Sequence, residues 1–308
     1  MIETEQLTKK YGDLVAIKDL SFRVEEGKIW GLLGPNAAGK TTTMRILTGF
    51  LPATSGRASV AGFDVFEQAE QVKQSIGYLP ENVPLYPEMT VESYLGFVAE
   101  IKKVPASRKK AAVDRAVEIT SLQPVRKRLI RNISRGFKQR VGIAQALIHN
   151  PRVIILDEPT IGLDPAQIVE IRQLIKSLKG EHTVMLSTHI LAEVKEVCDG
   201  VVIINEGRLM ASGSLDELAK SFSANDGVYL KLDKFDGQVI ELFKQIPNLK
   251  SLQLEGSEIR LEWSWDNDLR PAILKLCLEK NLTIREMRSA AMNIEELYLR
   301  IVSGGMEQ

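Results

Sequence analysis

The sequence predicts an α/β fold built on a mixed sheet, followed by a smaller α+β domain. Three observations carry this prediction. A glycine-rich segment ending in Gly39-Lys40-Thr41 follows the apolar run Ile29 to Leu33. A second apolar run, Val153 to Leu156, ends in two carboxylates. Over residues 222–227, Ser, Asn, Asp and Gly replace the periodic pattern, and a new series of strand and helix patterns begins.

Length and composition bound the possible functions. The chain has 308 residues, enough for two domains that each bury a core. We place the boundary between domains 1–222 and 223–308. Lys plus Arg and Asp plus Glu both number 40, so no nucleic-acid partner is expected. The densest basic cluster is interpreted as a solvated helix face or loop; it comprises Arg126, Lys127, Arg128 and Arg131.

The sequence indicates a cytoplasmic protein. Cys198 and Cys277 lie far apart in apolar helical surroundings and are expected to be reduced. Three histidines give no zinc-ligand spacing. The first ten residues do not resemble a signal peptide, and no stretch approaches the ~20 apolar residues needed to cross a bilayer. Any membrane-spanning part would therefore come from a partner.

The first domain alternates between strand and helix patterns. From Ile2 to Val24, alternating apolar and polar residues predict antiparallel strands. Helical spacing from about Val91 to Ile148, interrupted near Pro105 and Pro124, predicts a helical subdomain over about residues 88–150. A turn-rich segment at 52–64 precedes that subdomain. After the two carboxylates that follow Leu156, the sequence predicts a helix from Pro165 to about Leu178, a strand from Thr183 to Ser187 and a hairpin from Val201 to Ser212.

The sequence pattern of the second domain predicts the element order β-α-β-β-α-β, which is that of the ferredoxin-like motif. The two middle strands meet at Gly256-Ser257, a plausible two-residue hairpin. The expected elements are strand Val228 to Leu232, helix Gln238 to Ile246, strands Leu249 to Leu254 and Glu258 to Trp263, helix Leu269 to Glu279, strand Leu282 to Met287, and a closing helix over about 293–302.

Residues 34–41 match the phosphate-loop pattern GxxxxGK[ST] in its expected context, after a strand and before a helix at Thr42 to Thr48. Such a loop wraps a triphosphate with backbone N–H groups and brings its lysine to the outer phosphates. The competing interpretation is a glycine-rich turn ending in a solvated lysine. The predicted nucleotide-binding residues are Gly34, Pro35, Asn36, Ala37, Ala38, Gly39, Lys40, Thr41 and Thr42.

The acidic pair Asp157-Glu158 strengthens this prediction because it ends a buried strand, where ligands bind in open α/β sheets. Asp157 is then placed to hold Mg²⁺ together with Thr41. Glu158 is placed to polarise a water aimed at the γ-phosphate. A solvated acidic turn would explain each residue separately, but not the two motifs together.

With these motifs in place, the chain resembles the ATP-binding subunit of an ABC transporter over about residues 2–220. Residues Ile133 to Arg140 resemble the signature that is specific to that family. The resemblance implies that Ser134 and Gly136 complete the site of a neighbouring subunit, so that two ATP molecules lie between two head-to-tail domains. The second subunit could be a copy of this chain or a different one.

The resemblance also implies roles for individual residues outside the phosphate loop and the signature. Tyr11 stands where the family stacks an aromatic ring on adenine, although ordinary strand packing is the alternative. His189 resembles the switch histidine that touches the γ-phosphate, whereas an isolated histidine after a strand is more often a packing residue. Gly162-Leu163-Asp164 resembles the loop that links the two sites. The catalytic residues implied are Lys40, Glu158 and His189.

The chain departs from the family pattern in three places. Ala37 replaces a usual glycine, and its methyl group would cost on the order of 1 kcal/mol if the position requires positive φ. Arg135 and Phe137 replace the first glycine and the glutamine of the signature. Glu81 occupies the place of a glutamine that senses Mg²⁺, and is taken as a third metal-site residue beside Thr41 and Asp157.

The resemblance implies an ATPase that powers a separate transmembrane permease subunit, at the inner face of the cell membrane. A segment from Met292 to Leu299 resembles exporter-type subunits and indicates export. The alternatives are a soluble ABC-type ATPase acting on ribosomes or DNA and a nucleotide-gated module that does not hydrolyse ATP. The second domain could regulate, prop the dimer together or merely pack, since fold alone does not assign function.

Overall fold

The structure is a computed structural model, and it describes residues 1–215, 217–218, 226–233, 237–290 and 298. The chain divides into two compact units, residues 1–213 and 214–308, and each is described by itself. The predicted domain boundary at residues 222 and 223 falls outside the described ranges and stays a prediction.

A six-stranded sheet forms the centre of the first unit. Its strands are β3 (Ile29–Leu33), β6 (Ile76–Leu79), β7 (Val153–Asp157), β8 (Thr183–Thr188), β9 (Gly200–Asn205) and β10 (Arg208–Ser214), in the order β10-β9-β3-β8-β7-β6. The pairings from β9 through β3, β8 and β7 to β6 are parallel. Every residue of β3, β7 and β8 is buried, as expected where both faces of a parallel sheet are covered.

A second, antiparallel sheet comprises β1 (Ile2–Tyr11), β2 (Leu14–Val24), β4 (Ser55–Val60) and β5 (Phe63–Asp64), in the order β2-β1-β4-β5. Helix α1 (Lys40–Leu47) contacts strands of both sheets. Its buried Met44, Ile46 and Leu47 belong to one core cluster with side chains from both sheets. The helix that begins at the phosphate loop is therefore held on two sides.

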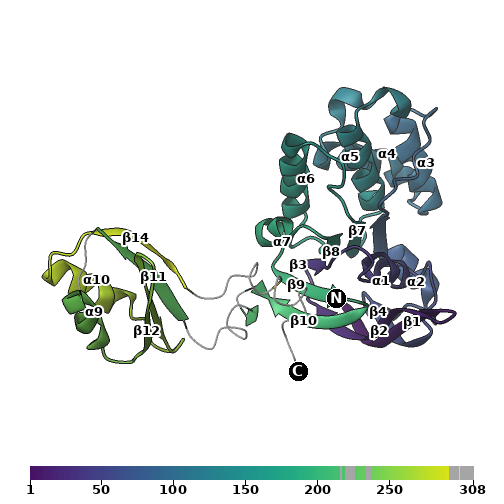
Figure 1. Ribbon diagram of the computed structural model, residues 1–308. Coiled ribbons are helices and arrows are strands. Elements are labelled where there is room, and N and C mark those ends of the chain that lie inside the picture. Colours follow the sequence, from purple (N-terminus) through teal and green to yellow (C-terminus); the bar gives the residue numbers. More distant parts are fainter. Residues whose placement is uncertain (216, 219–225, 234–236, 291–297, 299–308) are drawn as a thin grey trace. The chain divides into compact units, whose positions relative to one another are not determined.

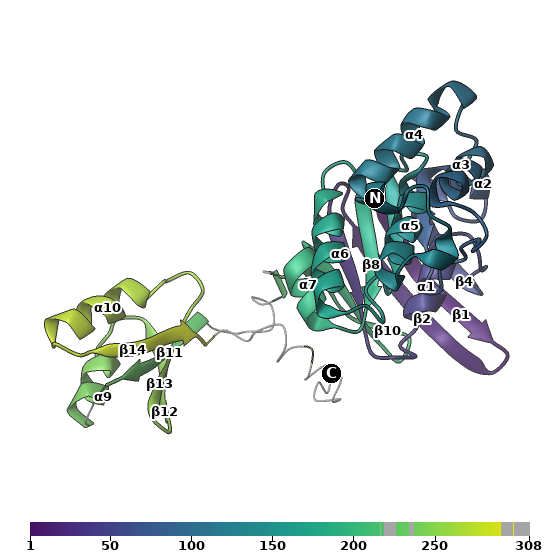
Figure 2. The same cartoon turned by 90° about the horizontal axis from the view of Figure 1, so that it is seen from above.

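The helices α3 (Val91–Ile101), α4 (Ala106–Ile119) and α5 (Arg135–Leu147) gather in a lobe away from β1, β2 and β4 (Figures 1 and 2). The lobe has its own core cluster. Pro105 immediately precedes α4, and a 3₁₀ turn at Gln123–Val125 follows it, which agrees with the interruptions predicted from the two prolines. Another 3₁₀ turn lies at Ile130–Asn132.

The second unit consists of β11 (Asp226–Leu232), α9 (Gly237–Lys244), β12 (Leu249–Glu255), β13 (Glu258–Trp263), α10 (Arg270–Glu279) and β14 (Ile284–Ser289). Its antiparallel sheet has the order β12-β13-β11-β14 around a core of its own. The element order is the one predicted, and assignment to the ferredoxin-like fold stays a prediction. The expected closing helix at 293–302 lies outside the described residues except for Tyr298.

Several short elements were not predicted. One of them is strand β6, at the edge of the main sheet. Gly77 allows this strand to approach α5, because a Cβ there would lie 2.1 Å from the carbonyl oxygen of Ala146. Helices α2 (Ala69–Ser75) and α7 (Leu191–Val197) are too short to give a clear period. Helix α6 (Pro165–Ser177) begins at the predicted proline. Within the described ranges, no helix is both long and apolar enough to span a bilayer.

Candidate functional site

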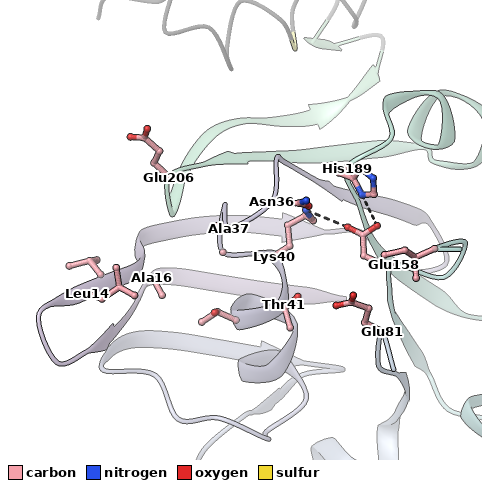
Figure 3. A pocket seen from close by; sticks show the side chains of 14 residues that line it. Leu14, Ala16, Asn36, Ala37, Lys40, Thr41, Glu81, Glu158, His189 and Glu206 are labelled. Atoms are coloured by element: carbon pink, nitrogen blue, oxygen red, sulfur yellow. Dashed lines mark hydrogen bonds and ion pairs between the residues drawn. The ribbon is translucent and has the colours of Figure 1, made fainter. Parts of the chain in front are cut away.

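A cavity of about 810 Å³ opens where the phosphate loop and the ends of β7 and β8 meet (Figure 3). Six of the predicted nucleotide-binding residues line it: Asn36, Ala37, Gly39, Lys40, Thr41 and Thr42. Its other walls come from Leu14, Val15, Ala16, Glu81, Glu158, Ile161, His189 and Glu206. The phosphate loop, the acidic strand and the predicted switch histidine thus share one cavity.

The loop conformation depends on its glycines. Gly39 adopts φ of 101°, and a Cβ at Gly34 would lie 2.4 Å from the carbonyl oxygen of Ile204. Helix α1 starts directly after Gly39, and no side chain in the described part of the chain caps it. The first N–H groups of a helix lack intrahelical partners and attract anions. Ala37 has φ of 66°, so it stands in the left-handed conformation that the sequence analysis considered.

Lys40 and His189 both contact Glu158. Lys40 Nζ lies 3.4 Å from Glu158 Oε1 and donates to the carbonyl oxygens of Gly34 and Pro35 at 2.8 and 3.2 Å. His189 Nδ1 lies 3.0 Å from Glu158 Oε2. Lys40 and Glu158 are 6% and 7% exposed, so this ion pair is little screened by solvent. Figure 3 shows the carboxylate directed toward both partners.

Asp157 has the properties of a cation ligand. It is 1% exposed, and its Oδ1 accepts a 2.5 Å hydrogen bond from Ser187 Oγ. Its Oδ2 is buried and has no hydrogen-bond partner among the described residues. Burial raises the pKa of Asp157 above its usual value, against the opposing effect of the hydrogen bond from Ser187. A cation at Oδ2 would supply the missing partner and favour the ionised form.

Thr41, Glu81 and Asp157 together line a second cavity of about 420 Å³. These are the three residues predicted for the metal, and they offer only oxygen atoms. No group of three or more His, Cys, Asp or Glu side chains that could enclose a metal occurs in the described ranges. Two carboxylates and a hydroxyl instead fit Mg²⁺, which is usually held by one or two carboxylates together with substrate phosphates.

The 810 Å³ cavity beside the phosphate loop is called the nucleotide cavity below, and Tyr11 does not line it. Tyr11 is 45% exposed. Lys9 Nζ lies 5.3 Å from the centre of its ring. Leu14, Val15 and Ala16, at the start of β2, supply the apolar wall on that side of the cavity. Stacking of adenine on Tyr11 therefore stays a prediction.

Ser134 and Gly136 lie apart from the phosphate loop of their own chain. Both line a separate cavity of about 460 Å³ with Asp164 and Gln167. Ser134 caps α5 by accepting a 3.3 Å hydrogen bond from the Phe137 N–H. A Cβ at Gly136 would lie 2.7 Å from the Gln167 side chain. Within one chain these residues do not reach the nucleotide cavity, and their predicted role requires a second subunit.

The sequence did not identify Ser187 as a site residue. Ser187 donates to Asp157 and accepts a 2.9 Å hydrogen bond from the Glu158 N–H, so it orders both acids. Its only signal was a hydroxyl at the end of a buried strand. Arg135, which replaces a glycine of the signature, packs its guanidinium on Gly162 and donates to the Ile161 carbonyl oxygen at 3.2 Å.

Comparisons with known proteins agree with this geometry. The family model described as ABC transporter matches residues 17–161. The bacitracin transport ATP-binding protein BcrA of Bacillus licheniformis is 34% identical over 99% of this chain and 98% of its own length. The probable multidrug ABC transporter ATP-binding protein YbhF of Escherichia coli is 40% identical over 73% of this chain and 39% of its own length.

Solved structures resemble the chain as well. An ATP-binding subunit of an ABC transporter superposes with a TM-score of 0.66 at 30% identity, covering 72% of this chain and 93% of that one. CbiO1 of Clostridium perfringens, part of the ABC transporter complex cbiONQ, gives 0.65 at 29% identity, covering 71% of this chain and 91% of that one.

Proposed function

Because this chain belongs to the ABC transporter family as an ATP-binding, ATP-hydrolysing subunit, we propose that two such subunits close head-to-tail on ATP and power export through a separate transmembrane permease subunit. The single observation that supports this most is the placement of Glu158, held between Lys40 and His189 at the mouth of the phosphate loop.

Three side chains carry the proposed hydrolysis. Glu158 is the general base: its carboxylate takes the proton of a water whose oxygen attacks the γ-phosphorus, and the bond to the bridging oxygen of ADP breaks. Lys40 binds the outer phosphates. Its ammonium contacts Glu158, so a triphosphate in the cavity would compete for that ammonium and free the carboxylate for water.

His189 orients Glu158 through Nδ1 and presents the rest of its ring to the cavity that it lines. Thr41 and Asp157 would hold Mg²⁺, with Glu81 beside them, and that ion would neutralise charge on the phosphates. The unpartnered Oδ2 of Asp157 is the observation that supports this assignment.

The two-subunit arrangement rests on Ser134 and Gly136. They lie at the N-terminus of α5, whose free N–H groups attract anions, yet they line a different cavity from the phosphate loop of the same chain. We assign them to the γ-phosphate bound by the opposite subunit, which closes the site and makes it competent for hydrolysis. The partner is a second copy of this chain or a similar subunit.

The direction and the location are proposed from the relatives. Proteins named for bacitracin and multidrug transport match this chain, and the segment from Met292 to Leu299 resembles exporter subunits. We therefore place the subunit on the inner face of the cell membrane, bound to a permease that selects the cargo. The comparisons give no support to a ribosomal or DNA-bound role.

Replacing Glu158 by Gln tests the proposal. The full chain should still bind MgATP, while phosphate release slows by about 10²- to 10⁴-fold, the usual contribution of a general base. Glu196→Gln is the control, because Glu196 is 43% exposed and lies on α7, where it pairs with Arg172. Undiminished release by the Glu158→Gln chain would remove Glu158 from the role of base.

A further inference from the structure

Glu193 is a buried carboxylate behind the site, and hydrolysis as described above does not use it. It lies on α7 and is 2% exposed. Its Oε1 accepts a hydrogen bond from Thr160 Oγ1, and its Oε2 accepts one from Thr188 Oγ1 at 2.7 Å. Arg172 Nη2, from α6, lies 3.5 Å from Oε1. The two threonines are 5% and 0% exposed.

Such an arrangement is costly unless every contact is made. A carboxylate taken out of water loses favourable hydration, which only a complete set of hydrogen bonds and a counter-charge offsets. Hydrogen bonds to an ionised group are also stronger than neutral ones. Glu193 therefore holds its two threonines firmly in place.

The two threonines belong to the segments that carry the catalytic pair. Thr160 lies two residues after Glu158, in a turn where the Ile161 N–H donates to the Glu158 carbonyl oxygen at 3.2 Å. Thr188 directly precedes His189, and its Oγ1 accepts a 3.0 Å hydrogen bond from the Ile190 N–H. One carboxylate thus ties the turn after Glu158 to the turn around His189.

The backbone of Glu158 needs such support. Its φ is 48°, a left-handed conformation that is unfavourable for a non-glycine residue and persists where surrounding contacts enforce it. Ser187 Oγ holds the N–H of Glu158 at 2.9 Å, and Thr160 fixes the chain on the other side of this residue.

We propose that Glu193 is a positioning residue, which holds Glu158 and His189 in register and thereby sets the rate of the hydrolytic step. The inference rests on the proposed role of Glu158 as the base. Among the described residues, the side-chain hydrogen bonds and the ion pair of Glu193 join it to Thr160, Thr188 and Arg172, and none of these three belongs to the phosphate loop or lines the nucleotide cavity. Its loss should therefore lower kcat and leave ATP affinity largely unchanged.

The test compares Glu193→Ala with Glu196→Ala in the full chain. Glu196 lies on the same short helix and pairs with the same Arg172, at 2.6 Å, but is 43% exposed. Glu193→Ala should lower kcat for ATP by about 10- to 100-fold, the cost of a misplacement near 1 Å, with KM changed by less than about threefold. Glu196→Ala should match the unsubstituted chain. Equal kcat in the two variants would overturn the proposal.

Two further variants separate positioning from loss of folded protein. In a Glu158→Gln background, adding Glu193→Ala should change single-turnover phosphate release by less than about threefold, because the base that Glu193 helps to position has already been replaced. An undiminished loss in that background would overturn the proposal. Glu193→Gln, which keeps one acceptor oxygen, should have a kcat between those of Glu193→Ala and the unsubstituted chain.

The Glu158→Gln chain, measured alongside, distinguishes the two hypotheses. If it hydrolyses ATP normally, the proposed role of Glu158 as the base is wrong, whatever Glu193→Ala does. If it is inactive while Glu193→Ala behaves like Glu196→Ala, the proposed function stands and only the positioning role is wrong.

Discussion

Replacing Ala37 by Gly should stabilise the first unit. Ala37 adopts φ of 66° within the phosphate loop, in the left-handed region where a Cβ costs roughly 1–2 kcal/mol. The residue is exposed, so removing its methyl group sacrifices little buried apolar surface. Glycine relieves the backbone strain at this position without altering the N–H groups that face the cavity.

The net gain can be worked out from two opposing effects. Relief of strain contributes about 1–2 kcal/mol, while the extra freedom of glycine in the unfolded chain takes back about 0.4–1 kcal/mol. We expect an increase of about 0.5–1 kcal/mol in the free energy of unfolding. For a unit of this size, 1 kcal/mol corresponds to roughly 2–4 °C, so the transition of the first unit should rise by about 1–4 °C.

Differential scanning calorimetry of the nucleotide-free full chain measures this shift. Ala38→Gly is the matched control: Ala38 is 2% exposed, belongs to the core beside α1 and has no positive φ. The same change there should destabilise the unit by about 1–2 kcal/mol, from lost burial and unfolded-state entropy. If Ala37→Gly melts at or below the unsubstituted chain, the strain assigned to Ala37 does not exist.

Three other changes have defined outcomes. Burial raises the pKa of Asp157, so its charge disfavours folding at neutral pH. The Asp157→Asn chain should therefore melt at a higher temperature without nucleotide and lose the stabilisation by MgATP. An MgATP-induced rise in melting temperature as large as that of the unsubstituted chain would contradict this. Burial lowers the pKa of His149 from 6.5 to about 4, so the unfolded chain binds this proton first and stability falls by about 2 kcal/mol from pH 7 to pH 5. His149→Gln should remove that part of the pH dependence in urea titrations, and an unchanged slope would refute it. Arg270 donates to buried Asp226 at 2.9 and 2.8 Å, so Arg270→Met should destabilise the second unit by about 1–3 kcal/mol in calorimetry. The control is Lys275→Met, at an exposed residue, which should change the stability by less than about 0.5 kcal/mol. Equal losses in the two variants would contradict the stabilising role of the Arg270–Asp226 pair.

The sequence predicts much of this site because its motifs are local. Strand β3 begins and ends at the residues expected from the apolar run before the phosphate loop. The acids Asp157 and Glu158 follow a run of apolar residues, and parallel strands end at one edge of a sheet. Lys40 and Glu158 could therefore be expected together, and the family resemblance added His189 to them.

Features that depend on three-dimensional neighbours could not be predicted. Ser187 bonds both acids only because β7 and β8 pair in parallel register. In the sequence, Glu193 is one of several charged residues in a short helical segment. Its role depends on Thr160 and Thr188, which only the fold places beside it. Gly77 permits the close approach of β6 and α5, which no local pattern reveals.

The mass of the Glu158→Gln chain with MgATP tests most directly whether Lys40 of one subunit and Ser134 of the other grip one nucleotide. Light scattering, with the permease subunit present and absent, should show a nucleotide-dependent pair of ATPase subunits that separates when ADP replaces ATP. Adding Ser134→Ala should weaken pairing at least about tenfold, since it removes the cap of the α5 N-terminus, which the proposed arrangement places beside the opposite γ-phosphate. Two results would contradict a nucleotide shared between two subunits. One is bound MgATP with no pairing in either preparation, and the other is pairing that is equally strong with Ser134→Ala.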